Sequence, residues 1–104
     1  MTNPVLDTIA QMTAASLVNF TGSPEELVLI RIAALAAVDA PEASYLLHIG
    51  PAAEAGVTLE DVSNVLVAIA PIVGTARIAS AAGKISDALD LAIAVVAAEE
   101  LAGE

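Results

Sequence analysis

The 104-residue chain lacks cysteine altogether and has few aromatic residues (2%) and only three cations. Without cysteine, the protein forms no disulfide, uses no thiolate and builds no zinc site of the cysteine type. Against the three Lys and Arg stand 13 Asp and Glu, a formal net charge of −10. Nucleic-acid binding needs a basic surface, so this charge excludes it and also disfavours an anionic membrane surface. We expect no cofactor and no bound metal.

What the chain has in abundance is small apolar residues: it is 58% hydrophobic and contains 24 alanines. Alanine has the highest helix propensity and lets helices pack closely, which predicts an all-α compact bundle in one domain, residues 1–104. Charged residues make up 15% of the chain, below the roughly 25% of typical domains. They cannot cover the surface, on the order of 5,000 Å², that a monomer of this size exposes. We therefore predict a homo-oligomer whose copies cover one another's apolar patches.

The mean hydropathy of +0.82 raises the question of a membrane span, which needs about 20 mostly apolar residues. The apolar run 27–38 is interrupted by Arg31, the run 65–73 contains Pro71, and the run 91–98 is short. The N-terminus has no basic region followed by an apolar core, so no signal peptide is expected. These features and the lack of cysteine predict a cytoplasmic protein without membrane-spanning segments.

Capping signals divide the chain into five helices, or six if the third is interrupted. Ser23-Pro24 with Glu26 forms a capping box before the second helix, Thr58 opens the fourth, and Thr75 is placed to cap the fifth. Pro51 predicts a kink or a short gap in the third helix, because proline lacks an amide hydrogen and collides with the preceding turn. The expected helices cover residues 4–19, 24–38, about 42–48 with one or two further turns to Gly56, 59 to about 71, and 76–98, followed by a frayed acidic end.

The helix over residues 24–38 is apolar on all sides except at Arg31, which predicts a central, fully enclosed helix. A buried guanidinium needs a partner because it cannot be neutralised by losing a proton. Glu25 and Glu26 have the wrong helical spacing, so the partner is expected on another helix, on another subunit or in a carboxylate ligand. The alternative is a structural role, with hydrogen bonds to helix-end carbonyl groups or an ion pair with Asp39, Glu42 or Asp61.

Several short motifs occur in order between Glu25 and Ala81. A helix starts with Glu-Leu at Glu26-Leu27, and the next helix ends near His48. An Ala-x-x-x-Gly segment follows at Ala52 and Gly56. A Thr-x-Glu-Asp cap at Thr58-Glu60-Asp61 opens a further helix, which Gly74 closes. This half of the chain resembles the carboxymuconolactone decarboxylase family, which includes alkyl hydroperoxidase D. The resemblance implies an all-α fold that assembles as trimers, hexamers or similar rings.

The chain departs from the peroxidase branch of that family, which uses Cys-x-x-Cys-x-x-x-His. Alignment on His48 puts those cysteines at Pro41 and Ser44. A peroxide reductase that cycles a disulfide needs two thiols, so this activity is excluded. The resemblance to the decarboxylase branch, which needs no cysteine, implies a cofactor-free lyase in which His48 transfers a proton. Glu26 corresponds to the family's proton-relay glutamate, although the capping box alone accounts for it.

His48 is the only histidine, and histidine is the side chain whose ordinary charge change falls near neutral pH, so His48 is a candidate general acid or base. The alternative is a helix-end histidine that donates to a backbone carbonyl or lines a seam between subunits. Tyr45 and Ser44 are near it and are candidates for hydrogen bonds to a ligand. Arg77 lies near the start of the last helix, where the dipole disfavours a cation, which indicates an anionic or intersubunit partner.

Two functions from different classes follow. The first is a carboxymuconolactone decarboxylase-like lyase on a small anionic substrate, with His48 as proton donor and Arg31 or Arg77 holding a carboxylate. The second is a non-catalytic helical binding or scaffold subunit of the same fold. A pocket in which His48 and an arginine converge favours the enzyme. Packing of His48 against leucine, with its nitrogens satisfied by backbone groups, favours the scaffold.

Overall fold

The computed structural model describes residues 3–103, apart from the side chain of Val96. These residues form helices and connecting turns without a strand, which confirms the predicted all-α class. The helices are α1 (Pro4–Asn19), α2 (Pro24–Ala37), α3 (Glu42–Glu54), α4 (Leu59–Val73) and α5 (Thr75–Ala102). Over the same described range, no helix has both the length and the apolar character that a bilayer span requires.

Side-chain caps begin three of the helices where the sequence predicts them. Asn3 accepts hydrogen bonds from two amide groups of α1. Ser23 and Glu26 form a reciprocal capping box at α2, and Thr58 and Asp61 form another at α4. Each box satisfies amide groups that have no partner inside the first helical turn. These boundaries depend on hydrogen bonds between residues two or three apart, which explains why they are readable from the sequence.

Both ends of α5 depart from the prediction. Thr75 is the first helical residue and not the cap, because only Gly74 separates α4 from α5. Gly74 has φ +95°, a conformation that side chains with a Cβ atom rarely adopt, and it joins the two helices directly. At the other end, α5 does not fray after Ala98 but continues to Ala102, since alanine, leucine and glutamate all have high helix propensity.

The short gap considered at Pro51 does not occur, because α3 is one continuous helix from Glu42 to Glu54. Pro51 removes only its own amide hydrogen bond, and it lies on the exposed side of the helix, where the carbonyl group left free is accessible to water. The chain turns at Gly56, as predicted, with φ +81°. Val57 N donates to Ala52 O at 2.9 Å, the outer hydrogen bond of a Schellman motif.

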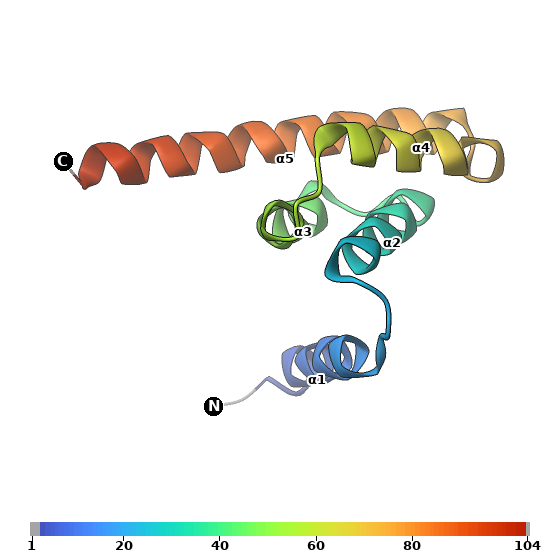
Figure 1. Ribbon diagram of the computed structural model, residues 1–104, viewed down its shortest axis with the longest axis horizontal. Helices are drawn as coiled ribbons and strands as arrows, with labels where there is room; N and C mark the ends of the chain where they lie inside the picture. Colours follow the sequence, from blue (N-terminus) through green and yellow to red (C-terminus); the bar gives the residue numbers. More distant parts are fainter. Residues whose placement is uncertain (1–2, 104) are drawn as a thin grey trace.

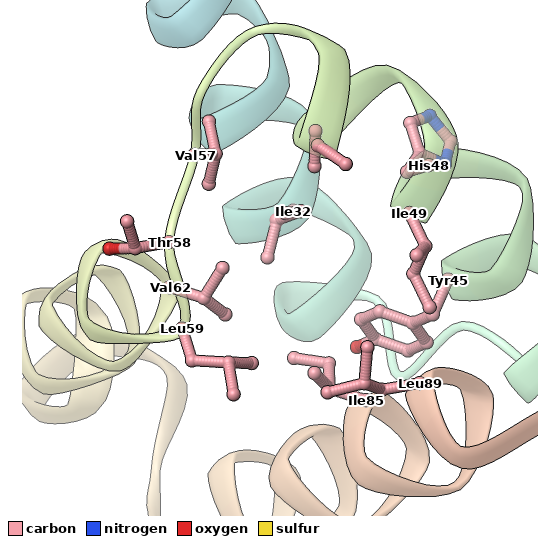
Figure 2. A pocket seen from close by; sticks show the side chains of 12 residues that line it. Ile32, Tyr45, His48, Ile49, Val57, Thr58, Leu59, Val62, Ile85 and Leu89 are labelled. Atoms are coloured by element: carbon pink, nitrogen blue, oxygen red, sulfur yellow. The ribbon is translucent and has the colours of Figure 1, made fainter. Parts of the chain in front are cut away.

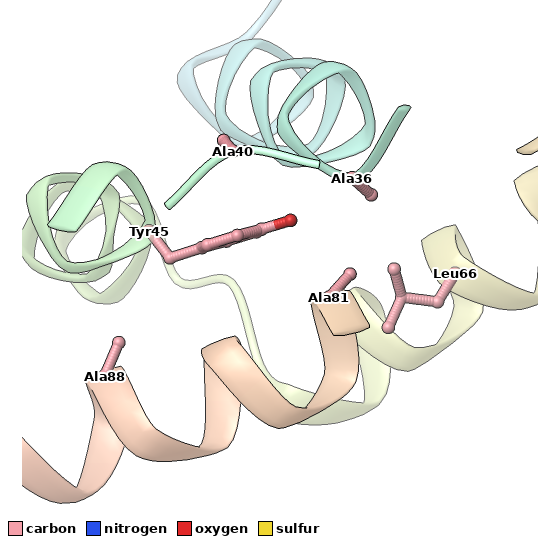
Figure 3. Close-up of a cluster of buried hydrophobic side chains, with 6 residues drawn as sticks. All are labelled: Ala36, Ala40, Tyr45, Leu66, Ala81 and Ala88. Atoms are coloured by element: carbon pink, nitrogen blue, oxygen red, sulfur yellow. The ribbon is translucent and has the colours of Figure 1, made fainter. Parts of the chain in front are cut away.

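Helices α2 to α5 pack as a compact bundle around small side chains (Figures 1 and 3). Figure 1 shows α4 beside the N-terminal half of α5, with α2 and α3 packed against the pair. Because four of the six residues in the main cluster are alanine, the helices approach one another closely. The main cluster consists of Ala36, Ala40, Tyr45, Leu66, Ala81 and Ala88, and a second cluster of Val28, Ile32 and Val62.

Within the chain, α2 is covered on one side only, so the prediction of a fully enclosed helix is wrong. Its buried residues are Val28, Ile32 and Ala36, which recur every four positions and form one stripe. Ile30, on the opposite side, is 56% exposed. The neighbouring helices determine which face of α2 is covered. A helix that is apolar on all sides does not show in its sequence which face that is.

In contrast to the other helices, α1 lies apart from the bundle (Figure 1). None of its residues is buried, and over the described residues no Cα atom of α1 lies within 8 Å of a Cα atom of another helix. Met12 and Val18 are 66% and 83% exposed. The C-terminal part of α5 also extends beyond the bundle. The radius of gyration is accordingly 15.1 Å, where a compact domain of 100 residues has about 13 Å.

The accessible surface of the single chain is 7026 Å². A compact monomer of 10.4 kDa would expose about 5,400 Å², so the excess is about 1,600 Å². Large apolar side chains contribute to this surface, among them Leu17 of α1, Ile72 of α4 and Leu101 of α5. The uncovered apolar surface expected from the composition is therefore present on the isolated chain.

Candidate functional site

An open groove between α1, α2 and α3, here called the Arg31 groove, is bordered by both Arg31 and His48. It has a volume of about 600 Å³ and exists because α1 stands away from the two helices that it faces. Arg31 extends from the middle of α2 and His48 from the middle of α3. The walls are formed by Met12, Thr13, Ser16, Leu17, Val28, Arg31, Ala34, Leu35, Leu47, His48 and Pro51.

Arg31 is partly buried, and its Nη2 donates a hydrogen bond to Ser16 Oγ of α1 at 3.0 Å. Among residues 3–103, no carboxylate oxygen lies within 4.0 Å of its guanidinium nitrogens. The ion pairs considered with Asp39, Glu42 or Asp61 are thus not formed. A guanidinium group has five N–H donors in a planar fork, so a single neutral hydroxyl leaves most of its binding capacity for a ligand.

His48 is held by the main chain of its own helix. Its Nδ1 lies 2.7 Å from Ser44 O, and because a carbonyl oxygen can only accept, Nδ1 carries the hydrogen. In the neutral ring Nε2 is then an acceptor. This is the backbone hydrogen bond that the non-catalytic alternative expects, but it engages one nitrogen and leaves Nε2 for a ligand or a proton. Ser44 acts here through its carbonyl group, not through its hydroxyl.

His48 also borders a second space, here called the Tyr45 cavity, of about 140 Å³ (Figure 2). In Figure 2 both ring nitrogens of His48 lie on the side away from Ile32, so the ring borders this cavity through its carbon atoms. The cavity is lined by Ile32, Tyr45, His48, Ile49, Ala52, Ala53, Val57, Thr58, Leu59, Val62, Ile85 and Leu89. Apart from His48, these residues differ from those of the Arg31 groove.

Tyr45 was expected to hydrogen-bond a ligand, and the structure places it deep in the bundle, with 3% of its surface exposed. Its hydroxyl has no hydrogen-bond partner among the protein groups that the structure describes. Burial, and to a smaller degree the charge of Asp39, raises the pKa of Tyr45 above the usual value for tyrosine. The phenol is therefore protonated at neutral pH and is available as a donor.

Glu26 and Arg77, the other two predicted site residues, lie elsewhere. Glu26 Oε1 accepts from Ser23 Oγ at 3.1 Å in the capping box, and it borders neither the Arg31 groove nor the Tyr45 cavity. Arg77 Nη1 donates to Ala37 O at 3.0 Å in the last turn of α2. A cation is stabilised there by the free carbonyl groups of the helix end. Arg31, and not Arg77, is the arginine that shares a space with His48.

Comparisons with family models, with curated proteins and with solved structures find no match to this chain. The resemblance of residues 25–81 to a family therefore rests on their motifs, and the candidate site rests on the geometry of Arg31 and His48. Within residues 3–103, no group of three or more His, Asp or Glu side chains is placed to hold a metal ion.

A polar cluster at the end of α2 was missed by the sequence reasoning. Asp39 has φ +52°, which is uncommon outside glycine but is tolerated by aspartate. Its Oδ1 accepts from Lys84 Nζ at 2.9 Å and from Ser80 Oγ at 2.7 Å. These bonds, the one from Lys84 most of all, lower the pKa of Asp39 below its usual value. The available signal was the spacing of Arg77, Ser80 and Lys84, which places them on one face of α5.

Proposed function

We propose that this protein is a carboxymuconolactone decarboxylase-like lyase that acts without a cofactor on a small carboxylate or lactone in the Arg31 groove. The observation that supports the proposal is that one groove is bordered both by a guanidinium with no ion-pair partner among residues 3–103 and by an imidazole engaged only through Nδ1. A carboxylate matches the planar fork of N–H donors that Arg31 presents. Thiol peroxidase activity is excluded because the chain has no cysteine.

The proposed reaction gives each of the two side chains one task. Arg31 binds a substrate carboxylate and sets the orientation of the lactone ring. Loss of CO₂ breaks a carbon–carbon bond and leaves the electron pair on the lactone as an enolate. His48, protonated from solvent, then delivers the Nε2 proton to a carbon atom of this enolate. Nδ1 carries a hydrogen in both imidazole and imidazolium, so its bond to Ser44 O holds the ring throughout.

The test is turnover of carboxymuconolactone, followed by CO₂ release, in the parent and in His48→Ala, Arg31→Gln and Arg77→Gln. We expect His48→Ala to lower kcat by roughly 10²–10⁴-fold, the usual effect of removing a general acid. Arg31→Gln should mainly raise KM. Arg77→Gln removes a cation outside the groove and should retain turnover. No turnover by the parent, or equal turnover by parent and His48→Ala, would contradict the lyase.

A second candidate, a non-catalytic helical binding or scaffold subunit, is supported by the uncovered apolar surface. The excess of about 1,600 Å² is twice the roughly 800 Å² that each partner contributes to a standard interface. A subunit in a ring has two neighbours, so the excess of total surface is large enough for two such contacts, as in the trimer or hexamer that the family resemblance implies. We propose that α1, none of whose residues is buried within the chain, contributes to these contacts.

Light scattering coupled to size exclusion tests this assembly. We expect the intact protein to have a mass of three or six times 10.4 kDa, and deletion of residues 1–22 to lower that number. A 10.4-kDa monomer at all concentrations would rule out self-association. The two candidates share the assembly, and the turnover measurement separates them: an oligomer without turnover is the scaffold.

A further inference from the structure

The Tyr45 cavity is a second candidate binding site that the proposed lyase reaction does not use. It lies between α2, α3, α4 and α5 and shares only His48 with the Arg31 groove. None of its lining residues is charged, and most are aliphatic, among them Ile32, Val62 and Ile85. Figure 2 shows these three side chains converging from α2, α4 and α5.

Tyr45 presents no hydrogen-bonding group to the cavity that it borders. Its hydroxyl oxygen has almost no exposed surface, and Figure 3 shows it directed toward Ala36 and Ala81 of the main cluster. Neither alanine lines the cavity. A molecule in the cavity therefore meets only the carbon atoms of the Tyr45 ring.

The other two polar side chains of the lining also direct their polar atoms elsewhere. The hydroxyl oxygen of Thr58 accepts from Asp61 N at 3.1 Å in the cap of α4, and Figure 2 shows it directed away from Ile32 and Ile85. His48 borders the cavity through ring carbon atoms, since both of its nitrogens lie on the far side of the ring. A polar ligand would thus lose hydrogen bonds to water and find no side-chain partner in their place.

The volume of the cavity sets the size of the molecule that it accommodates. At about 140 Å³ it is close to the roughly 150 Å³ of an engineered apolar cavity in another protein that binds benzene. Such a space accepts one six-membered ring. An ion would lose its hydration there without gaining a counter-charge.

We propose that the Tyr45 cavity binds a small hydrocarbon, a single six-membered ring without polar substituents. Removal of the ring from water and its contacts with the aliphatic walls supply the binding free energy. Rings of the same size that carry a hydrogen-bond donor or acceptor are rejected. The site is independent of the proposed lyase, because it uses neither Arg31 nor Nε2 of His48.

Benzene is the probe, and pyridine is the control, because it has the same size and shape, is uncharged at neutral pH and carries one acceptor nitrogen. Binding is followed in the full-length protein by the methyl resonances of Ile32, Val62 and Ile85, which the ring current of a bound aromatic molecule shifts. We expect saturable shifts with benzene and roughly tenfold or more weaker binding of pyridine, whose nitrogen loses its hydrogen bond to water. The exposed methyl groups of Val18 and Ile72 report non-specific adsorption and should not saturate.

Two variants of α3 test whether the cavity itself is the site. Ala52 lines the cavity, so Ala52→Leu fills part of it and should weaken benzene binding roughly tenfold or more. Ala43 is exposed on the same helix and does not line the cavity, so Ala43→Leu is the matched control and should bind benzene as the parent does. The methyl spectrum without ligand verifies that each variant folds.

The proposal is overturned if benzene produces no saturable shift at the three cavity positions, or if pyridine binds the parent as tightly as benzene does. It is equally overturned if folded Ala52→Leu binds benzene as well as Ala43→Leu does. If Ala52→Leu does not fold, the comparison of benzene with pyridine in the parent decides.

Discussion

Helices α1 and α2 are neighbours in sequence and similar in character, yet they differ completely in burial. Both begin with a side-chain cap and a proline, and both are mostly apolar. In the folded chain α2 buries Val28, Ile32 and Ala36 against three other helices, whereas no residue of α1 is buried. The difference shows that apolar sequence measures the capacity of a helix for burial, while the facing elements determine whether that capacity is used.

The same two helices differ in how polar groups attach them to the rest of the chain. The end of α2 is joined to α5 by Lys84 and Ser80 on Asp39 and by Arg77 on Ala37 O. α1 is joined to α2 by the hydrogen bond from Arg31 to Ser16. Arg77 and Lys84 therefore join α5 to the end of α2, whereas Arg31 borders the groove between α1, α2 and α3.

The largest predicted difference in stability is between two truncated isoleucines, one in α2 and one in α1. Ile32→Ala, at a position 6% exposed, should lower the free energy of unfolding by roughly 2–5 kcal/mol, because it removes packed methyl groups and leaves a cavity. Ile9→Ala, at a position 53% exposed, should change it by less than about 0.5 kcal/mol in dilute solution. Urea unfolding of both variants measures the difference.

Protein concentration sharpens this comparison. If copies of the chain cover α1, Ile9→Ala should become costly as the concentration rises, because the assembled state then contributes to stability. Equal losses for the two variants at every concentration would mean that α1 is packed within its own chain, contrary to its exposure in the structure.

A gain in stability is expected at one position inside the bundle. Tyr45→Phe removes a buried hydroxyl that has no protein partner in the described part of the chain, so it should raise the free energy of unfolding by about 1–3 kcal/mol. Thermal and urea unfolding of the variant without added ligand measure this change. A loss of stability would show that the hydroxyl has a favourable partner in solution.

The smallest effect is expected at the polar cluster that joins α2 to α5. The pKa of Asp39 is lower in the folded chain than the ordinary 3.8, so the folded state binds fewer protons there than the unfolded state. The stabilisation is complete above the unfolded pKa, near pH 4, and is lost as the pH falls below it through the folded value. Lys84 and Asp39 are 29% and 48% exposed, so the contribution is small.

The melting temperature as a function of pH tests this cluster. Lys84→Met should melt slightly below the parent at pH 7, and the difference should shrink as the pH falls below 4 and Asp39 takes up a proton. Lys84→Arg keeps the charge and should follow the parent more closely. A difference between parent and Lys84→Met that is constant with pH would exclude the ion pair as its cause.

Much of the fold was predictable, and the candidate site was predictable only as single residues. The caps at Ser23 and Thr58 and the turn at Gly56 were readable because their hydrogen bonds join residues at most five apart. The continuity of α3 was not, since the cost of Pro51 depends on which side of the helix meets solvent. Arg77 suggested an anionic ligand because its acceptor, Ala37 O, lies 40 residues away in sequence.

The sequence by itself determined the all-α class, the capped starts of α1, α2 and α4, and the exclusion of thiol chemistry, because these follow from residue types and from contacts within a single turn. Only the tertiary structure decided that one face of α2 is covered, that α1 stands apart, and that Arg31 and not Arg77 borders a groove with His48. These outcomes depend on how whole helices pack against one another. In a chain with 24 alanines, many helix faces are similar enough that local pattern does not distinguish them.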